Sequence, residues 1–224
     1  MTTEATLAEL DARIAARSIL QHPFYRAWSA GTLTRDDLAA YARLYYPHVA
    51  AFPEYLRAAI DGAELPEVRA ELRDNLREEE AEPRPHSELW LAFAAAVGAD
   101  PEAVRTAAPA ASTDEVVADF RRLCATSTAS ALAALYAYES QQPEVSEEKT
   151  RGLRERYGIE DTSALAYFTV HSEADRRHRD GERRAIALCL EAGTSGEEVL
   201  AAADAALDAY WRLLDGVCAE TMAA

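Results

Sequence analysis

Strong helix formers fill almost every segment of this chain, and this feature restricts its fold more than any other. Ala, Leu, Glu and Arg dominate the sequence, whereas Val and Ile are scarce. The four dominant residues favour helices, and no segment alternates apolar and polar residues as a half-buried strand does. We therefore expect an all-α protein. The helices are expected at about residues 4–20, 23–30, 35–62, 67–81, 86–98, 114–139, 144–157, 162–191 and 196–219.

Signals for the ends of helices support this prediction. Hydroxyl residues closely followed by acidic residues are typical of helix starts, and glycines readily adopt the left-handed conformation that ends a helix. Prolines are expected to break the chain, because proline removes a backbone hydrogen bond. We expect the helices to form one domain over residues 1–224. The start signals are Thr34, Thr113 and Ser195, the stop signals are Gly31, Gly98, Gly158 and Gly193, and the breaks are Glu82-Pro83-Arg84-Pro85 and Pro143.

A formal net charge of −16 limits the partners of this chain. A nucleic-acid-binding protein needs a basic face for phosphate, so we expect no binding to nucleic acid or to an anionic membrane. No apolar run is long enough to cross a bilayer. Residues 1–20 have the pattern of an amphipathic helix and lack the basic start and apolar stretch of a signal peptide. These features predict a cytoplasmic protein.

The cysteines agree with that location. Cys124, Cys189 and Cys218 are far apart and odd in number, so they match neither a zinc motif nor a disulfide framework. We interpret them as buried thiols in a reducing compartment.

Two histidines and an aspartate in one predicted helix are the first candidate site residues. His171, Asp175 and His178 are spaced i, i+4 and i+7, which brings them to one face of a helix. Two imidazoles and a carboxylate are suitable ligands for a first-row transition metal. A polar surface face remains the alternative, because Arg176 and Arg177 belong to the same segment.

Other acidic residues strengthen the metal hypothesis. Glu79 ends one predicted helix and His86 begins the next, and Glu139 ends a markedly apolar helix, where a buried carboxylate needs a partner or a metal. The alternatives are a solvated charge run at residues 78–80 and a helix that ends in solvent at Glu139. Together with the first three residues, this set suits two divalent ions with open positions for oxygen. The chain contains no Glu-x-x-His motif, which argues against a ferritin-like site.

Lys149 is the single lysine among 23 basic residues. Two explanations remain open: a general bias towards arginine, as in GC-rich coding, or a need for an amine at this position. Lysine can lose its proton, act as a nucleophile or donate nitrogen, which a guanidinium normally does not.

A series of motifs links these residues to a known family. They extend from about residue 22 to residue 190 and comprise His22–Gly31, Tyr41–Tyr46, Phe52-Pro53, Asn75–Glu79, His86–Trp90, Ala134–Gln141, Lys149–Leu153 and Tyr167–His178. In their combined spacing the chain resembles the heme-oxygenase-like dimetal oxidases. Within that family it is most similar to the group of the chlamydial protein associating with death domains and its folate-linked bacterial relatives.

The resemblance implies a fold and a metal centre. The fold is a seven-helix bundle like those of TenA and PqqC, with the metal site inside. The centre holds two divalent transition-metal ions, iron or a mixed iron and manganese pair, and uses dioxygen and an electron donor. We also expect a homodimer. By motif match the six metal ligands are Glu79, His86, Glu139, His171, Asp175 and His178.

The resemblance also implies an activity, the oxygen-dependent formation of para-aminobenzoate for folate synthesis. In that reaction the protein itself is consumed: Tyr25 matches the tyrosine that supplies the ring, and Lys149 matches the lysine that supplies the amine. Tyr41, Tyr138 and Tyr167 match further tyrosines that relay oxidising equivalents. Other lysines of the family are absent from this chain, and nothing in it indicates a death-domain partner.

Three other functions are compatible with the same sequence. A conventional dimetal oxygenase would use the same six ligands on a diffusible substrate such as an amino acid or a fatty acid. A cofactor-free relative, like the pyrroloquinoline-quinone-forming oxidase or the thiaminases, would bind no metal. A non-enzymatic interaction protein would show neither metal nor catalysis.

Overall fold

A computed structural model describes residues 1–81 and 84–222, and the elements of these ranges are helices, as expected. Glu82 and Pro83 of the expected proline break lie outside the described residues. The helices are α1 (Thr3–Ala16), the 3-10 helix η1 (Ile19–Gln21), α2 (Pro23–Ala30), α3 (Arg35–Gly62), α4 (Pro66–Glu79), α5 (His86–Ala96), α6 (Pro101–Thr106), α7 (Ala111–Thr126), α8 (Thr128–Glu139), α9 (Gln142–Glu155), α10 (Thr162–Glu191) and α11 (Gly196–Thr221).

The expected number of seven helices is wrong, because the described residues form α1 to α11. The segment predicted as one helix over 114–139 is divided at Ser127, whose backbone is extended (φ −160°, ψ 163°) and whose side chain accepts a hydrogen bond from the backbone N–H of Ser130. Thr113 is not a helix start, since α7 begins at Ala111. The hydroxyl of Thr113 instead donates to the carbonyl of Leu44 at 2.8 Å.

Most of the other predicted helix ends are confirmed. Thr34 forms a capping box with Asp37 at the start of α3, and the Ser195 side chain accepts from the N–H of Glu197 at the start of α11. Pro143 lies in the first turn of α9, after α8 has ended at Glu139. The four predicted stop residues all have positive φ: Gly31, Gly98, Gly158 and Gly193.

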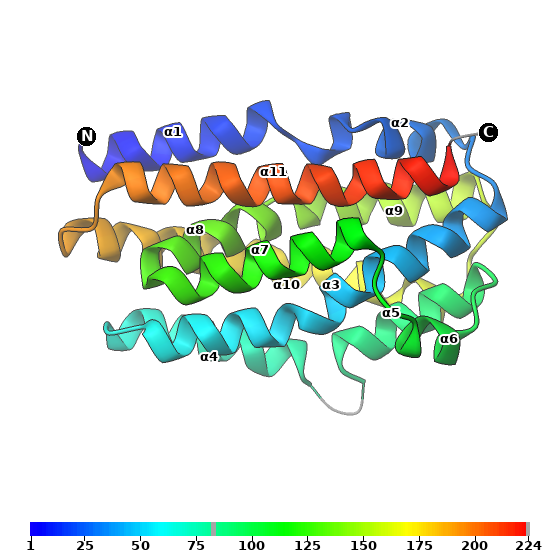
Figure 1. The fold of residues 1–224 in the computed structure, drawn as a ribbon, viewed down its shortest axis with the longest axis horizontal. Coiled ribbons are helices and arrows are strands. Elements are labelled where there is room, and N and C mark those ends of the chain that lie inside the picture. The colour runs from blue at the N-terminus through cyan, green and yellow to red at the C-terminus, as the bar shows by residue number, and fades with distance from the viewer. Residues whose placement is uncertain (82–83, 223–224) are drawn as a thin grey trace.

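The helices are arranged around α8. Figure 1 shows α1 and α11 side by side along one edge of the bundle, α4 and α5 along the opposite edge, and α7 and α8 between them. Because α8 packs against α10 and α11, its residues from Ala129 to Glu139 are all buried. The carboxylate of Glu139 therefore lies in the core, so the solvent-exposed alternative for this residue is wrong.

Helix α3 contains two internal prolines, Pro47 and Pro53. Proline removes a helical N–H and frees a carbonyl one turn earlier, which weakens the ladder around it. On the N-terminal side of Pro47, the carbonyl of Ala42 accepts a hydrogen bond at 2.8 Å from Nε1 of the buried Trp90. This contact fixes α5 against the stretch of α3 that carries Tyr41 and Tyr45.

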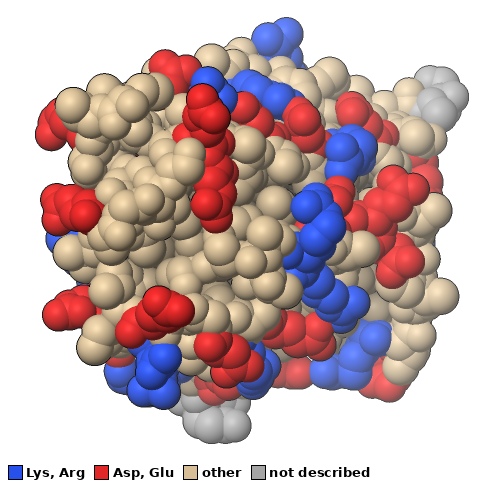
Figure 2. Space-filling view, turned by 60° about the vertical axis from the view of Figure 1, so that its left-hand side comes forward, with Lys and Arg blue, Asp and Glu red and all other residues tan. Residues whose placement is uncertain are grey.

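Charged residues of both signs lie close together on the surface. On the face drawn in Figure 2, basic side chains have acidic side chains beside them. Among the described residues, ion pairs such as Arg121–Glu54 and Arg105–Glu88 (2.7 Å each) are exposed. Exposed pairs contribute little to stability. Within residues 1–81 and 84–222, no helix combines the length and the apolar character needed to span a membrane.

Candidate metal centre

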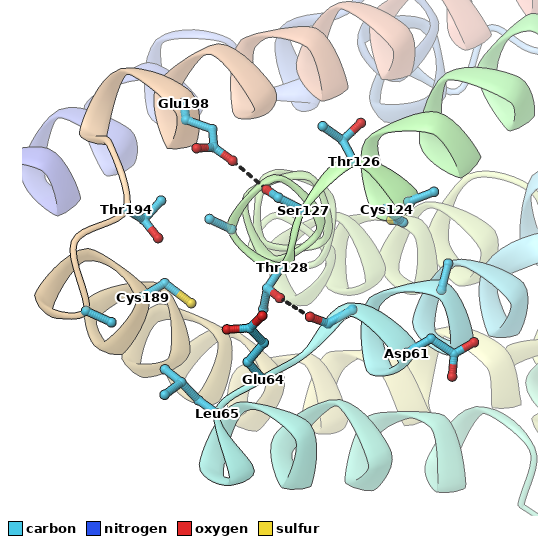
Figure 3. Close-up of a pocket in the computed structure, with 15 residues that line it drawn as sticks. Asp61, Glu64, Leu65, Cys124, Thr126, Ser127, Thr128, Cys189, Thr194 and Glu198 are labelled. Atoms are coloured by element: carbon cyan, nitrogen blue, oxygen red, sulfur yellow. Dashed lines mark hydrogen bonds between the residues drawn. The ribbon is translucent and has the colours of Figure 1, made fainter.

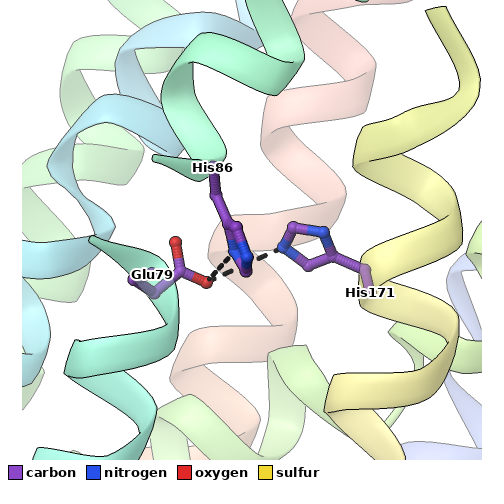
Figure 4. Close-up of side chains that lie close together, drawn as sticks. All are labelled: Glu79, His86 and His171. Atoms are coloured by element: carbon purple, nitrogen blue, oxygen red, sulfur yellow. Dashed lines mark hydrogen bonds and ion pairs between the residues drawn. The ribbon is translucent and has the colours of Figure 1, made fainter. Parts of the chain in front are cut away.

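Glu79, His86 and His171 form the first of two buried groups of ligand-type side chains (Figure 4). His86 Nδ1 lies 2.8 Å from Oε1 of Glu79, and His171 Nε2 lies 3.7 Å from the same oxygen. The Nδ1–H of His171 donates to the backbone carbonyl of Tyr167 at 2.7 Å, which leaves Nε2 as the atom that faces the group. A hydrogen bond of this kind fixes the tautomer of a metal-binding histidine.

Glu139, Asp175 and His178 form the second buried group. His178 Nδ1 lies 3.4 Å from Oε2 of Glu139 and 3.4 Å from Oδ1 of Asp175. The side-chain amide of Asn75 donates to both carboxylate oxygens of Glu139 at 3.0 Å and holds that carboxylate in place. In each group the ligand-type atoms lie within 4.8 Å of one another, close enough for one ion to contact all three.

The second group contains buried polar atoms without hydrogen-bond partners. Asp175 Oδ2 and both ring nitrogens of His178 are buried and have no such partner among the described residues. A buried polar atom is destabilising unless it is paired, and these atoms are the nitrogen and oxygen donors that divalent iron and manganese accept. The residues present therefore fit a transition-metal ion.

Within each group, histidines and carboxylates shift the pKa values of their neighbours. Burial by itself would raise the pKa of Glu79, but His86 and His171 beside it hold that pKa well below its usual range. Burial would lower the pKa of His178, but Asp175 and Glu139 raise it to about 11. The lowered pKa of Glu79 keeps this buried carboxylate in its charged form, which is the form that binds a metal cation.

One small cavity connects the two groups. Glu79 and His171 of the first group and Glu139 and Asp175 of the second line it together. Its volume of about 10 Å³ holds the centre of about one water-sized molecule. Four of the six predicted ligands therefore face one cavity, and His86 and His178 each belong to one of the two groups that meet there. The role of all six as ligands stays a prediction.

Sequence reasoning missed two further residues of this centre. Asn75 and Glu182 are 2% and 1% exposed, and both oxygens of Glu182 lack a hydrogen-bond partner among the described residues. Burial, and then the charge of Glu139, raises the pKa of Glu182. Helical register contained the signal, since Asn75 precedes Glu79 by four residues and Glu182 follows His178 by four residues.

Lys149 lies in a cage of aromatic rings and is 1% exposed. Its Nζ atom is 5.4 Å from the ring centre of Tyr25 and 5.3 Å from that of Tyr41. Burial lowers the pKa of Lys149 to about 7, so a large fraction of the amine is neutral at physiological pH. The other cage rings are those of Tyr45, Trp90 and Phe168, at 5.2–5.6 Å.

This lowered pKa predicts how the stability of the protein varies with pH. The unfolded chain holds a proton on Lys149 up to about pH 10.5, whereas the folded chain releases it near pH 7. Unfolding therefore takes up a proton in this window, and the free energy of unfolding rises with pH by up to about 1.4 kcal/mol per pH unit. Lys149→Met lacks this contribution. Chemical denaturation from pH 7 to 9 should show that the free energy of unfolding of wild type rises relative to that of the variant. If the two free energies change in parallel with pH, the amine of Lys149 is not buried in its neutral form.

Of the predicted tyrosines, Tyr25 and Tyr41 form part of this cage, and Tyr138 and Tyr167 line the small cavity of the metal centre. Tyr25 and Tyr41 are in contact through their hydroxyls at 3.4 Å, and the Tyr45 and Tyr138 hydroxyls are 2.9 Å apart. Sequence reasoning missed Tyr45, for which only its place one turn after Tyr41 gave a signal.

A line of ring contacts joins the two regions. Tyr167 stacks on His171 with ring centres 4.0 Å apart, and Trp90 is 4.9 Å from Tyr167. Trp90 is in turn 5.6 Å from Tyr41 and is stacked on Tyr45 at 5.0 Å. Aromatic side chains thus extend without interruption from a metal-centre histidine to Lys149.

One pocket lies apart from the candidate centre. A surface pocket of about 760 Å³ lies between the end of α3 and the start of α8, as Figure 3 shows. Cys124, Cys189 and the carboxylate of Glu198 line it, but no histidine does. Burial raises the pKa of both thiols, which makes them unreactive. None of the six predicted ligands lines this pocket, so it does not belong to the candidate centre.

Comparison with known proteins gives consistent similarities. Residues 39–211 match a haem-oxygenase-like family described as iron-containing redox enzymes. A 4-aminobenzoate synthase of Chlamydia trachomatis is 40% identical over 210 residues, which cover 93% of this chain and 90% of that protein. A 4-aminobenzoate synthase of Nitrosomonas europaea is 38% identical over 227 residues, 97% of this chain and 92% of that protein.

Solved structures are similar in fold. A Shewanella denitrificans domain with a heme-oxygenase-like fold has a TM-score of 0.80 at 22% identity, and the match covers 96% of this chain and 92% of that one. A TenA homologue of Pseudomonas syringae has a TM-score of 0.81 at 18% identity, covering 95% and 91%. The expected similarity to the TenA bundle is thereby confirmed.

Proposed function

Because the chain belongs to the haem-oxygenase-like family of iron-containing redox enzymes, we propose that it is an oxidase that forms 4-aminobenzoate. The ring comes from Tyr25, the amine from Lys149, and dioxygen and an electron donor are consumed. The names of relatives at 38–44% identity over most of the chain support this product.

The observation that carries the proposal is the burial of the chain's single lysine among tyrosine rings. An amine without a nearby carboxylate is costly to bury in its charged form, and burial alone accounts for the lowered pKa of Lys149. The neutral amine keeps its lone pair and can form a bond from nitrogen to an oxidised ring carbon. Arginine remains charged and is a poor nucleophile.

Six residues would hold the metal ions. Glu79, His86 and His171 would bind one ion, and Glu139, Asp175 and His178 would bind the other. When bound, a pair of redox-active ions supplies the activation of dioxygen. The protein contributes a cavity with room for about one small molecule, a carboxylate fixed by Asn75, and histidines aimed inwards.

Tyr25 has the features of a ring donor. It is fully buried, its hydroxyl has Tyr41 as a neighbour at 3.4 Å, and burial raises its pKa well above the usual value, so the phenol keeps its proton until it is oxidised. Its conversion requires cleavage of the Cα–Cβ bond and oxidation of Cβ to a carboxylate, with dioxygen as the oxidant. The oxidised ring carbon would condense with the Lys149 amine, its oxygen leaving as water, and hydrolysis would then break the Cε–Nζ bond and leave an aldehyde on the lysine side chain. Tyr41, Tyr138 and Tyr167 relay oxidising equivalents, and the ring contacts through Trp90 join Tyr167 to Tyr41.

The size of the cavity disfavours a diffusible substrate. A cavity of about 10 Å³, lined in part by Val49 and Phe52, has room for about one water-sized molecule, which favours a small gas over an amino acid or a fatty acid. A substrate that is already part of the fold needs no such space.

Product formation tests the proposal. Protein loaded with Fe(II) or Mn(II) and given a chemical reductant should release 4-aminobenzoate in air, measured by chromatography with mass detection. Protein kept anaerobic, or treated with a chelator, should release none. Equal product under all three conditions would overturn the proposal.

A further inference from the structure

The three consecutive glutamates at the end of α4 have different surroundings. Glu79 is buried in the first metal group. Glu80 is exposed and pairs with Arg57. Glu78 is partly exposed, with 38% of its side chain accessible, and pairs with Arg177 at 2.8 Å.

Glu78 also reaches the second metal group. Its Oε2 lies 3.3 Å from Nε2 of His178, on the side of the imidazole ring opposite the group. The other ring nitrogen, Nδ1, faces Glu139 and Asp175 at 3.4 Å each. The His178 ring therefore lies between two ligand-type carboxylates and Glu78.

The two histidines of α10 are held in different ways. In His171, Nδ1 is the ring nitrogen that faces away from the metal group, and it donates to the carbonyl of Tyr167 in the same helix at 2.7 Å. The ring of His178 has no hydrogen-bond partner of the required alignment among the described residues. Glu78 is a carboxylate within hydrogen-bonding reach of its outward nitrogen.

We infer that Glu78 is a positioning residue for His178. Its carboxylate accepts the Nε2–H, so Nδ1 keeps its lone pair for the ion held with Glu139 and Asp175. Arg177 holds the carboxylate in position from the solvent side. A carboxylate behind a metal-binding histidine orients the ring and makes it a stronger donor. The inference rests on the proposed metal centre.

Substitutions along this run of glutamates test the inference. Glu78→Ala removes the acceptor, Glu78→Gln keeps an oxygen acceptor without the charge, and Glu80→Ala removes a similarly exposed carboxylate from the next position. Mn(II) alone is titrated into each protein, and free Mn(II) is measured by electron paramagnetic resonance. We expect Glu78→Ala to weaken one of two binding steps by about 10–100-fold, Glu78→Gln to weaken it less, and Glu80→Ala to match wild type.

Two further readouts separate positioning from a structural effect. The melting temperature without metal should be the same for wild type and Glu78→Ala, and the spectrum of bound Mn(II) should change only in the Glu78 variants. If wild type binds Mn(II) and Glu78→Ala binds it equally well, or if Glu80→Ala is equally weakened, the inference is overturned while the metal centre stands. If wild type itself binds no Mn(II), the metal centre and the inference both fail.

Discussion

Tyr25→Phe and Lys149→Met are each expected to abolish release of 4-aminobenzoate. Phenylalanine preserves the buried ring of Tyr25 but lacks the oxygen whose carbon must receive nitrogen. Methionine fills the aromatic cage of Lys149 with a side chain of similar length and no amine. Product is measured after one round of metal loading, reduction and aeration. Both variants should bind Mn(II) as wild type does, because neither residue is in the metal groups.

A matched control is available on α8. Tyr136 is two residues from Tyr138, but its hydroxyl donates to Asp11 at 2.7 Å, away from the cage. Tyr136→Phe should therefore leave the product yield unchanged. Undiminished product from Tyr25→Phe and Lys149→Met would refute the assignment of the two residues. Loss of product from Tyr136→Phe as well would indicate a general effect on folding.

Glu139→Gln is expected to remove much of the stabilisation that metal gives to the protein. An ion present at about a hundred times its Kd adds about 2.7 kcal/mol to the free energy of unfolding, which for a chain of this size raises Tm by on the order of 5–10 °C. Glutamine keeps an oxygen that can accept from Asn75 but lacks the charge that holds a cation. The variant should lose the contribution of one ion, measured as the Tm difference with and without Mn(II).

The control for this experiment is Glu144→Gln. Glu144 lies in the first turn of α9 and its side chain is 59% exposed, so it shares the region but not the burial of Glu139. It should retain the full metal-dependent shift. An equal shift in wild type and Glu139→Gln would show that Glu139 holds no ion.

Local sequence spacing was sufficient to predict part of the centre. His171, Asp175 and His178 belong to one helix, so their common face follows from helical geometry alone. Glu79 and His86 flank a short break, which limits how far apart they can lie. The chemical requirement of a buried carboxylate indicated Glu139. In each case a short stretch of sequence was enough to predict which side chains belong to the centre.

Contacts between distant helices could not be predicted in this way. The cage of Lys149 is built by rings from α2, α3, α5 and α10, and no local pattern determines how these helices pack. The break at Ser127 was missed because no glycine or proline marks it; the hydroxyl run Thr126–Thr128, which is typical of a helix start, was the available signal. Helical register placed Asn75 one turn before Glu79, but its role could not be predicted, because its hydrogen-bond partner Glu139 is 64 residues away.

The central claim is that the protein supplies both parts of its product, and isotope labelling tests it most directly. Protein is produced with carbon-labelled tyrosine rings and with lysine labelled at its ε nitrogen, and it is then loaded with metal and aerated in unlabelled buffer. Because Lys149 is the single lysine, any labelled amine has one source. We predict 4-aminobenzoate that carries both labels, together with an equal amount of protein altered at Tyr25. Unlabelled product, with Tyr25 intact, would contradict the account and indicate a diffusible substrate.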